Sequence, residues 1–324
     1  MGRRIAVLVM AYGTASGPDD VERYYTDIRS GSPPPPHLLK ELKDRYAAIG
    51  NRFPLLDITR RQGAALEVEL NRKSKGGFRV YLGMKHSPPS IGEGVAAIRA
   101  DGVERAVGLV MAPHYSRLSV ETYIDRVQAA LQSESSPKVG FTFVRSWHDH
   151  PLFVSAVASR VDEALGRLGE EDRRRATVIF SAHSLPARIA DEGDPYPGEL
   201  RRTAELVASR LDLPSFVVAW QSAGRTPEPW LAPDLGDVIR DLAANGVPAL
   251  VVCPCGFVAD HLEILYDVDI EAHRSSEKAG VKMVRTRSMN DDPDFIAALA
   301  RVVEDHLASR ESASTPLSAR GAEK

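Results

Sequence analysis

Short apolar segments alternate along the chain with stretches in which apolar residues recur about every 3.6 positions. The apolar segments predict strands over residues 5–10, 78–83, 105–111, 139–144, 176–180, 215–220, 248–253 and 281–285. The stretches between them predict amphipathic helices, such as the one around Leu38, Leu42 and Tyr46 that ends at Gly50. Strands that alternate with helices favour parallel sheets covered on both faces. The pattern therefore predicts an α/β protein with four strands in each half.

Internal repetition supports a division into two similar halves. Residues 7–13 (VLVMAYG) resemble residues 178–184 (VIFSAHS), and residues 109–113 (LVMAP) resemble residues 250–254 (LVVCP). Both matches occur in the same order, which indicates a duplication. We predict two Rossmann-like domains, each a four-stranded parallel sheet flanked by helices, with a cleft between them.

The domain limits follow from the same pattern. The first domain is expected over residues 1–147 and the second, with a metal site, over residues 148–291. Asp292 and Pro293 predict the start of a helix over residues 292–308, which we expect to pack on the first domain. Residues 309–324 are small and polar and predict a disordered tail.

Composition excludes several classes of protein. The 324 residues include 41 Lys and Arg against 44 Asp and Glu, so no basic excess indicates nucleic-acid binding. The longest apolar runs fall far short of the roughly 20 residues that span a bilayer. The two cysteines, Cys253 and Cys255, exclude a disulfide scaffold and cannot supply the four thiolates of an iron–sulfur cluster. These features favour a cytoplasmic protein without stable membrane insertion.

Candidate chemistry follows the ends of the strands, where parallel α/β sheets bind their ligands. Tyr12 follows the first strand, and His183 follows the fifth. A neutral imidazole can bind a transition metal or accept a proton, although a histidine at a strand end can equally be a structural residue. His183 would lie beside Glu263 if the strands that begin near residues 176 and 248 are neighbours. This edge would suit a large flat ligand and a metal.

Three carboxylates lie four residues apart after the seventh strand: Glu263, Asp267 and Glu271. On a helix they form a row on one face, where like charges repel unless a cation or proton is shared. Two interpretations stay open. The row conducts protons or hard cations such as Mg²⁺ towards Glu263, or its carboxylates face solvent, where their repulsion is screened.

Several segments give the sequence a specific resemblance to the ferrochelatases. They are SAHSLP at 181–186, WQSAG at 220–224, PWLAP at 229–233 and GFVADHLE at 256–263. The likeness covers residues 4 to 306, and MAYGT at 10–14, DRY at 44–46 and GMKH at 83–86 look like the soluble branch of the family. This resemblance implies a chelatase-like fold and a monomeric cytoplasmic lyase. It also implies insertion of Fe²⁺ into coproporphyrin III, which forms coproheme in haem biosynthesis.

The resemblance also implies roles for individual residues. His183 and Glu263 would bind the metal and accept protons, with Asp267 and Glu271 as the route for cations or protons. Tyr12 would lie on the opposite face of the ring and ligate the product iron. The remaining positions that match porphyrin contacts are Arg29, Arg45, Tyr46, Phe53 and Tyr123. Phe53 departs from the pattern, because the soluble branch has a small hydroxyl residue there.

Three other functions stay open at this point. The chain could be a protoporphyrin IX ferrochelatase, although no long apolar lip segment follows Arg29. It could be a chelatase that inserts cobalt into sirohydrochlorin, or a carrier that binds a tetrapyrrole without catalysis. The expected partners are coproporphyrin III and, transiently, other enzymes of the haem pathway. The expected metals are Fe²⁺ as substrate and Mg²⁺ at the row of Glu263, Asp267 and Glu271, called the acidic row below. No iron–sulfur cluster is expected.

Overall fold

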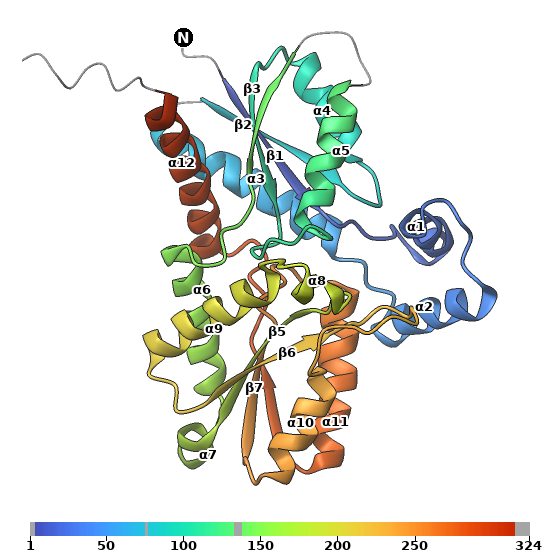
Figure 1. The fold of residues 1–324 in the computed structure, drawn as a ribbon, viewed down its shortest axis with the longest axis vertical. Helices are drawn as coiled ribbons and strands as arrows, with labels where there is room; N and C mark the ends of the chain where they lie inside the picture. The colour runs from blue at the N-terminus through green and yellow to red at the C-terminus, as the bar shows by residue number, and fades with distance from the viewer. Residues whose placement is uncertain (1–3, 75–76, 133–137, 315–324) are drawn as a thin grey trace, which may run out of the picture.

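The fold consists of two parallel four-stranded sheets that share one strand order. The computed structural model describes residues 4–74, 77–132 and 138–314 (Figure 1). The first sheet has the order β2-β1-β3-β4, with β1 (Ile5–Ala11), β2 (Phe78–Met84), β3 (Arg105–Val110) and β4 (Gly140–Val144). The second has the order β6-β5-β7-β8, with β5 (Thr177–His183), β6 (Phe216–Gln221), β7 (Ala249–Cys253) and β8 (Lys282–Arg285). The predicted α/β fold with two similar halves is confirmed.

Helices cover both faces of each sheet, which explains why the inner strands are continuous apolar runs. In the first half they are α1 (Val21–Ile28), α2 (Pro36–Ala48), α3 (Leu55–Ser74), α4 (Ile91–Ala100), α5 (Val120–Gln132) and the 3₁₀ turn η1 (Pro18–Asp20). In the second they are α6 (Pro151–Leu165), α7 (Glu170–Arg175), α8 (Arg188–Asp191), α9 (Tyr196–Leu211), α10 (Leu235–Ala244), the π-helix η2 (Glu263–Ala272) and α11 (His273–Ala279). None of the described helices is long and apolar enough to cross a membrane.

The last helix, α12 (Pro293–Ser314), joins the two halves and is longer than predicted. It packs on α3 of the first half and on α6 of the second. The expectation of disorder from residue 309 is wrong for residues 309–314, because no glycine or proline interrupts the helix before Pro316. The Ser312 hydroxyl also donates to the carbonyl of Ala308 within this last stretch. The rest of the expected tail, residues 315–324, lies outside the described part of the chain.

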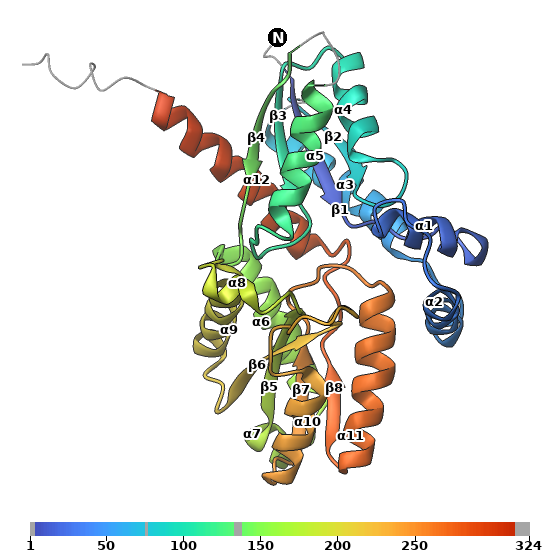
Figure 2. The ribbon, with the colours of Figure 1, turned by 45° about the vertical axis from the view of Figure 1, so that its right-hand side comes forward.

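One apolar core runs through both halves and fixes their arrangement. It includes Leu66 of α3, Val107 of β3, Phe153 of α6, Phe180 of β5 and Phe295 of α12, all fully buried or nearly so. The strands of both sheets run towards the junction between the halves, so the carboxyl ends of both sheets face it (Figures 1 and 2). Side chains that follow the strands of either sheet consequently meet in one region.

Helices α1 and α2 form an excursion from the first sheet, inserted between β1 and α3, that reaches the second half (Figure 2). Tyr24 of α1, Tyr46 of α2 and Ile49 form an apolar cluster with Leu265 of the π-helix. This packing closes one side of the junction, and it brings α2 against the helix that bears the acidic row.

Candidate functional site

The neighbouring strands β5 and β7 bring His183 and Glu263 together. His183 ends β5, and Glu263 is the first residue of the π-helix that follows β7. The loop after β7 can approach β5 because residue 256 is glycine, where a Cβ would lie 2.4 Å from the Cβ of Ala182. The Nε2 atom of His183 lies 3.7 Å from Oε1 of Glu263.

This separation suits two ligands of one metal ion. Histidine nitrogens and carboxylate oxygens bind ions such as Zn²⁺ at about 2.0–2.2 Å, so two ligands of one ion can lie up to about 4 Å apart. The Nδ1 atom of His183 donates to the carbonyl oxygen of Ser184, which can only accept. In the neutral imidazole, Nε2 then has a free lone pair on the side of Glu263. The Tyr196 hydroxyl fixes the strand end by donating to the carbonyl of His183, at 2.9 Å.

A second histidine, His261, contacts the same carboxylate. Its Nδ1 atom lies 2.9 Å from the carbonyl oxygen of Ala259, and its Nε2 atom lies 3.5 Å from Oε2 of Glu263. Burial opposes protonation of His261, but Glu263 outweighs it and raises the pKa of His261. Burial likewise opposes ionisation of Glu263, but His183, His261 and Arg45 hold the pKa of Glu263 at about 2. Glu263 is therefore a carboxylate at any physiological pH.

The role of His261 was missed from the sequence. It immediately precedes the helix, where residues two apart are not expected to contact each other. The short DHLE segment that contains His261 and Glu263 was the one available signal.

The acidic row lies on a π-helix, in which backbone bonds join residues five apart, as from the His273 N–H to the Val268 carbonyl. Asp267 is buried and forms an ion pair with Arg45 of α2, while its other oxygen accepts from the Ser222 hydroxyl. Burial raises the pKa of Asp267 to about 6, helped by Glu263 and opposed by Arg45. The side chain of Glu271 is half exposed, and its Oε2 atom lies 3.9 Å from the guanidinium nitrogen Nη2 of Arg45.

The row therefore has a protein cation beside it. The Arg45 guanidinium lies between α2 and the π-helix, and it also stacks on the ring of Tyr266, 4.6 Å from the ring centre. In the described ranges, no group of three or more His, Cys, Asp or Glu residues is arranged to hold a metal ion. Any cation bound to Asp267 would have to displace Arg45.

The first half contributes a cluster of aromatic side chains and one lysine to the junction. Tyr12 follows β1, is 40 % exposed, and packs on the ring of His86 with 4.6 Å between ring centres. The Lys85 ammonium lies 5.9 Å from the ring centre of Tyr12 and 5.2 Å from that of Tyr123, and it donates to the Thr122 hydroxyl at 2.7 Å. Burial, together with the nearby Arg126, lowers the pKa of Lys85 to about 8.

Electrostatics connects the two halves across this region. Partial removal of the Tyr12 phenol from water by its neighbours, and then the negative charge of Glu263, raise the pKa of Tyr12. Burial and Glu263 also raise the pKa of Tyr46 to about 12, although its hydrogen bond with Thr14 opposes the shift. Tyrosines of the first half thus lie within the field of the carboxylate of the second half.

The other residues predicted to contact the porphyrin differ in whether they already bond to neighbouring side chains. Arg29 directly follows α1 and is exposed, and among the described residues its guanidinium makes no hydrogen bond or ion pair. The Tyr46 hydroxyl lies 3.3 Å from the Thr14 hydroxyl, and the Tyr46 ring stacks on Phe53 with 4.3 Å between ring centres. Tyr123 is buried, and burial raises its pKa. Arg29 is free for a ligand carboxylate, whereas Arg45 is already paired.

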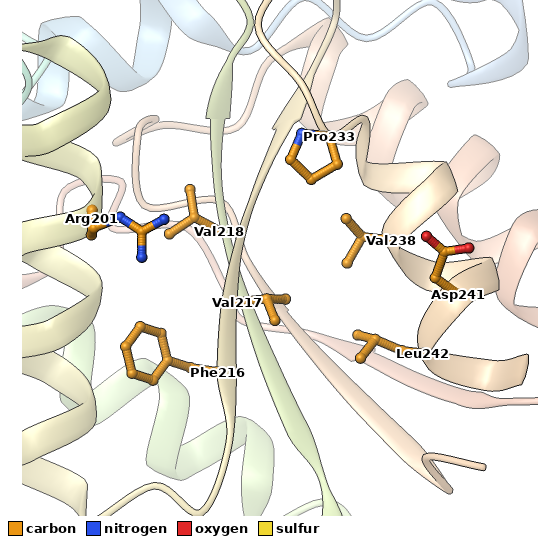
Figure 3. A pocket seen from close by; sticks show the side chains of 8 residues that line it. All are labelled: Arg201, Phe216, Val217, Val218, Pro233, Val238, Asp241 and Leu242. Carbon is orange, nitrogen blue, oxygen red and sulfur yellow. The ribbon is translucent and has the colours of Figure 1, made fainter. Parts of the chain in front are cut away.

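A pocket of about 420 Å³ lies away from this group, on both sides of the edge strand β6 (Figure 3). It is lined by Phe216, Val217 and Val218 of the strand and by side chains of α9 and α10. His183 pairs with Gln221 at the opposite end of the same strand. The pocket is therefore separate from the histidine–carboxylate pair.

Solved structures with a similar fold include the sirohydrochlorin chelatase SirB. The chain resembles SirB from Bacillus subtilis, solved with Fe³⁺, with a TM-score of 0.58 and 14% identity, over 95% of this chain and 98% of that one. It resembles CbiX, described as the terminal enzyme of sirohaem biosynthesis in denitrifying bacteria, with a TM-score of 0.53 and 12% identity, over 93% and 98% of the chains. At these identities the likeness establishes the fold alone.

Sequence comparison identifies the family. The ferrochelatase family model matches residues 4–307. A ferrochelatase of Thermus thermophilus is 46% identical over 92% of this chain and 98% of its own length. Coproporphyrin III ferrochelatases of Halalkalibacterium halodurans and Bacillus subtilis are 43% and 44% identical, over 95% and 93% of this chain and 99% and 97% of their own lengths. The chain belongs to the ferrochelatase family.

Proposed function

We propose that this protein inserts Fe²⁺ into coproporphyrin III to form coproheme, a step of haem biosynthesis. Relatives that cover nearly the whole chain are named coproporphyrin III ferrochelatases. The structural observation that carries the proposal is the 3.7 Å separation between Nε2 of His183 and Oε1 of Glu263. An unprotonated nitrogen and an ionised carboxylate at this distance can hold a divalent ion as it enters a ring.

The two residues have different roles in this proposal. Insertion of Fe²⁺ releases two pyrrole protons, so the site needs a base as well as a metal ligand. With a pKa of about 2, Glu263 is a poor proton acceptor at neutral pH and serves as the metal ligand. His183 presents a free lone pair at Nε2, and a neutral imidazole can accept a pyrrole proton near pH 7. The single lone pair at Nε2 of His183 takes the two pyrrole protons one after the other, and His183 shares the incoming iron only while Nε2 carries no proton.

The first half binds the substrate in the same proposal. Tyr12 lies on the opposite face of the ring and ligates the iron of the product. Arg29 and Arg45 bind carboxylates, because a guanidinium forms paired hydrogen bonds with a propionate. Arg45 must exchange Asp267 for the propionate to do so. Tyr46 and Tyr123 contact the ring, and Phe53 contributes only apolar packing against Tyr46.

The acidic row serves proton release in this account. A pKa of about 6 suits Asp267 to exchange protons near neutral pH, and the exposed Glu271 leads outward from it. Mg²⁺ at the row would require Arg45 to move. We further propose that the protein works as a cytoplasmic monomer that meets other enzymes of the haem pathway transiently.

Insertion of cobalt into sirohydrochlorin is the second candidate, because a sirohydrochlorin chelatase solved in complex with cobalt has a similar fold. Purified protein is incubated without oxygen with coproporphyrin III, protoporphyrin IX or sirohydrochlorin, each with Fe²⁺ or Co²⁺, and metallation is followed by absorbance. We expect the highest kcat/KM with coproporphyrin III and Fe²⁺. Preference for sirohydrochlorin would overturn the proposed function, and binding without metallation would favour a carrier.

A further inference from the structure

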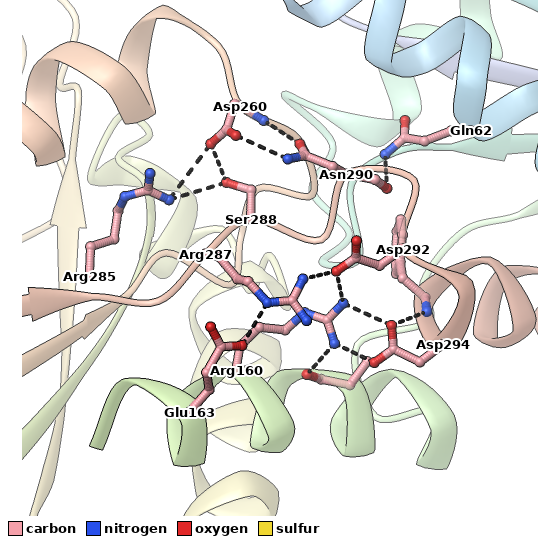
Figure 4. A network of polar contacts seen from close by, with 12 residues as sticks. Gln62, Arg160, Glu163, Asp260, Arg285, Arg287, Ser288, Asn290, Asp292 and Asp294 are labelled. Atoms are coloured by element: carbon pink, nitrogen blue, oxygen red, sulfur yellow. Dashed lines mark hydrogen bonds and ion pairs between the residues drawn. The ribbon is translucent and has the colours of Figure 1, made fainter. Parts of the chain in front are cut away.

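Asn290 occupies the connection between β8 and α12, at the centre of a polar network (Figure 4). Its φ angle is +45°, in the left-handed region that L-amino acids other than asparagine and aspartate rarely adopt. It lies outside the histidine–carboxylate pair, and neither the fold prediction nor the proposed function assigns it a role.

The side chain of Asn290 holds Asp260 by two reciprocal hydrogen bonds. Its Oδ1 atom accepts from the Asp260 backbone N–H at 2.9 Å, and its Nδ2 atom donates to Oδ2 of Asp260 at 3.0 Å. The other carboxylate oxygen of Asp260 accepts from the Ser288 hydroxyl at 2.7 Å. Asp260 is therefore fixed at its backbone and at both oxygens.

The backbone of Asn290 binds the same loop and connects it to the first half. The Asn290 N–H donates to the Val258 carbonyl at 3.0 Å. The buried amide of Gln62, on α3, donates to the carbonyls of Asn290 and Val258 at 2.8 and 3.3 Å. Figure 4 shows Gln62 reaching this turn from the first half. Asn290 thus ties residues 258–260 to both halves of the molecule.

The fixed loop leads directly to the metal-binding carboxylate. Asp260 immediately precedes His261, whose ring contacts both Ala259 and Glu263. The His261 carbonyl accepts from the N–H groups of Ile264 and Leu265 and so starts the π-helix. A shift of residues 258–260 would therefore move the His261 ring and the Glu263 carboxylate together.

We infer that Asn290 is a positioning residue for metal insertion, acting through Asp260 and His261 to hold Glu263 opposite His183. This inference rests on the proposed function. Asparagine meets three requirements of the position at once: a left-handed backbone, an acceptor for the Asp260 N–H and a donor for its carboxylate. Glycine meets only the first requirement. Aspartate lacks the donor and places a second negative charge beside Asp260.

The test compares Asn290→Gly and Asn290→Asp with the unmodified protein. Glycine accepts the positive φ, so Asn290→Gly removes the two side-chain hydrogen bonds to Asp260, keeps the backbone bonds to Val258 and Gln62, and does not strain the backbone. We expect kcat/KM for Fe²⁺ to fall about tenfold, as when an outer partner of a metal ligand is lost. KM for the porphyrin should change less than about twofold, because its carboxylate partners lie elsewhere. We expect Asn290→Asp to be at least as impaired.

A second readout does not depend on turnover. In ¹⁵N-histidine NMR spectra, the ring signals of His261 should shift or broaden in Asn290→Gly. The control is Asp212→Gly, which replaces an exposed residue with φ of +48° after α9 and should leave kinetics and spectra unchanged.

The outcomes separate this inference from the proposed function. Unmodified protein that metallates no tetrapyrrole would refute the proposed function, while the His261 signals would still decide whether Asn290 positions that ring. Normal metal kinetics and an unchanged His261 spectrum in Asn290→Gly would overturn the inference and leave the proposed function intact. A loss of thermal stability without the fall in kcat/KM for Fe²⁺ would also overturn it.

Discussion

The two sides of the junction differ in how far their side chains are already engaged. On the side of the second half, the rings of His183 and His261 bond to backbone carbonyl oxygens, and the carboxylate of Glu263 lies 3.5 Å from Nε2 of His261. On the side of the first half, Tyr12 is 40 % exposed and the guanidinium of Arg29 has no ion pair among the described residues. The chemistry of metal transfer needs fixed geometry, whereas a large flat substrate with flexible propionate groups needs side chains that are free to bind it.

The largest expected effect is on the fixed side. His183→Ala removes the nitrogen that accepts a pyrrole proton, and we expect metal insertion to fall at least about 100-fold. Porphyrin binding should remain, because the carboxylate partners belong to the other side. Anaerobic metallation and fluorescence titration of the porphyrin measure the two quantities. His273→Ala, on exposed α11, is the matched control. Undiminished insertion in His183→Ala would remove the proposed base.

The second largest effect is expected on binding of the porphyrin by the first half. Arg45→Ala removes one propionate partner and should raise KM for coproporphyrin III about tenfold, the loss expected for one charge-assisted hydrogen bond. Arg225→Ala is a matched control, because Arg225 also pairs across the halves, with Glu41 of α2. Steady-state kinetics that respond equally to both variants would assign Arg45 to joining the halves and not to the substrate.

A third prediction concerns how the ionisation of Glu263 makes the free energy of unfolding depend on pH. The pKa of Glu263 is lowered to about 2 from the 4.5 that is ordinary for a glutamate, so its carboxylate stabilises the fold above pH 4.5. This stabilisation is lost as pH falls from 4.5 through 2, and about 1 kcal/mol of it should be gone by pH 4. Urea unfolding of the protein and of Glu263→Gln at pH 7 and pH 4 measures the difference. A gap between the two proteins that does not narrow at pH 4 would contradict it.

The smallest effect is spectroscopic. Tyr12→Phe keeps the ring that packs on His86 but removes the phenol oxygen. Porphyrin binding should therefore be nearly unchanged, while the visible spectrum of the bound iron product shifts through loss of its axial ligand. An identical product spectrum would exclude Tyr12 as that ligand.

The sequence predicted the features that depend on local pattern and strand order. Apolar runs placed the strands within one residue of their observed bounds, except that β5 continues three residues beyond its expected end, to His183. The adjacency of β5 and β7 was enough to expect His183 beside Glu263. These features follow from burial and from the rules of parallel sheets, which leave a clear periodic signal.

Features that depend on side chains far apart in the chain left no such signal. Arg45 and Asp267 are separated by 222 positions, and their pairing depends on how α2 folds back onto the π-helix. The sequence assigned Arg45 to the substrate and Asp267 to a cation route, without the contact between them. The π-helical geometry and the hydrogen bonds between Asn290 and Asp260 likewise arise only from tertiary packing.

The central claim is that one metal ion can be held by His183 and Glu263 together. A crystal structure of the protein soaked with Co²⁺, with data collected at the cobalt absorption edge, tests it most directly. The account predicts an anomalous peak about 2.0–2.3 Å from both Nε2 of His183 and a carboxylate oxygen of Glu263. A peak between Asp267 and Glu271, with the histidine and Glu263 unoccupied, would contradict it.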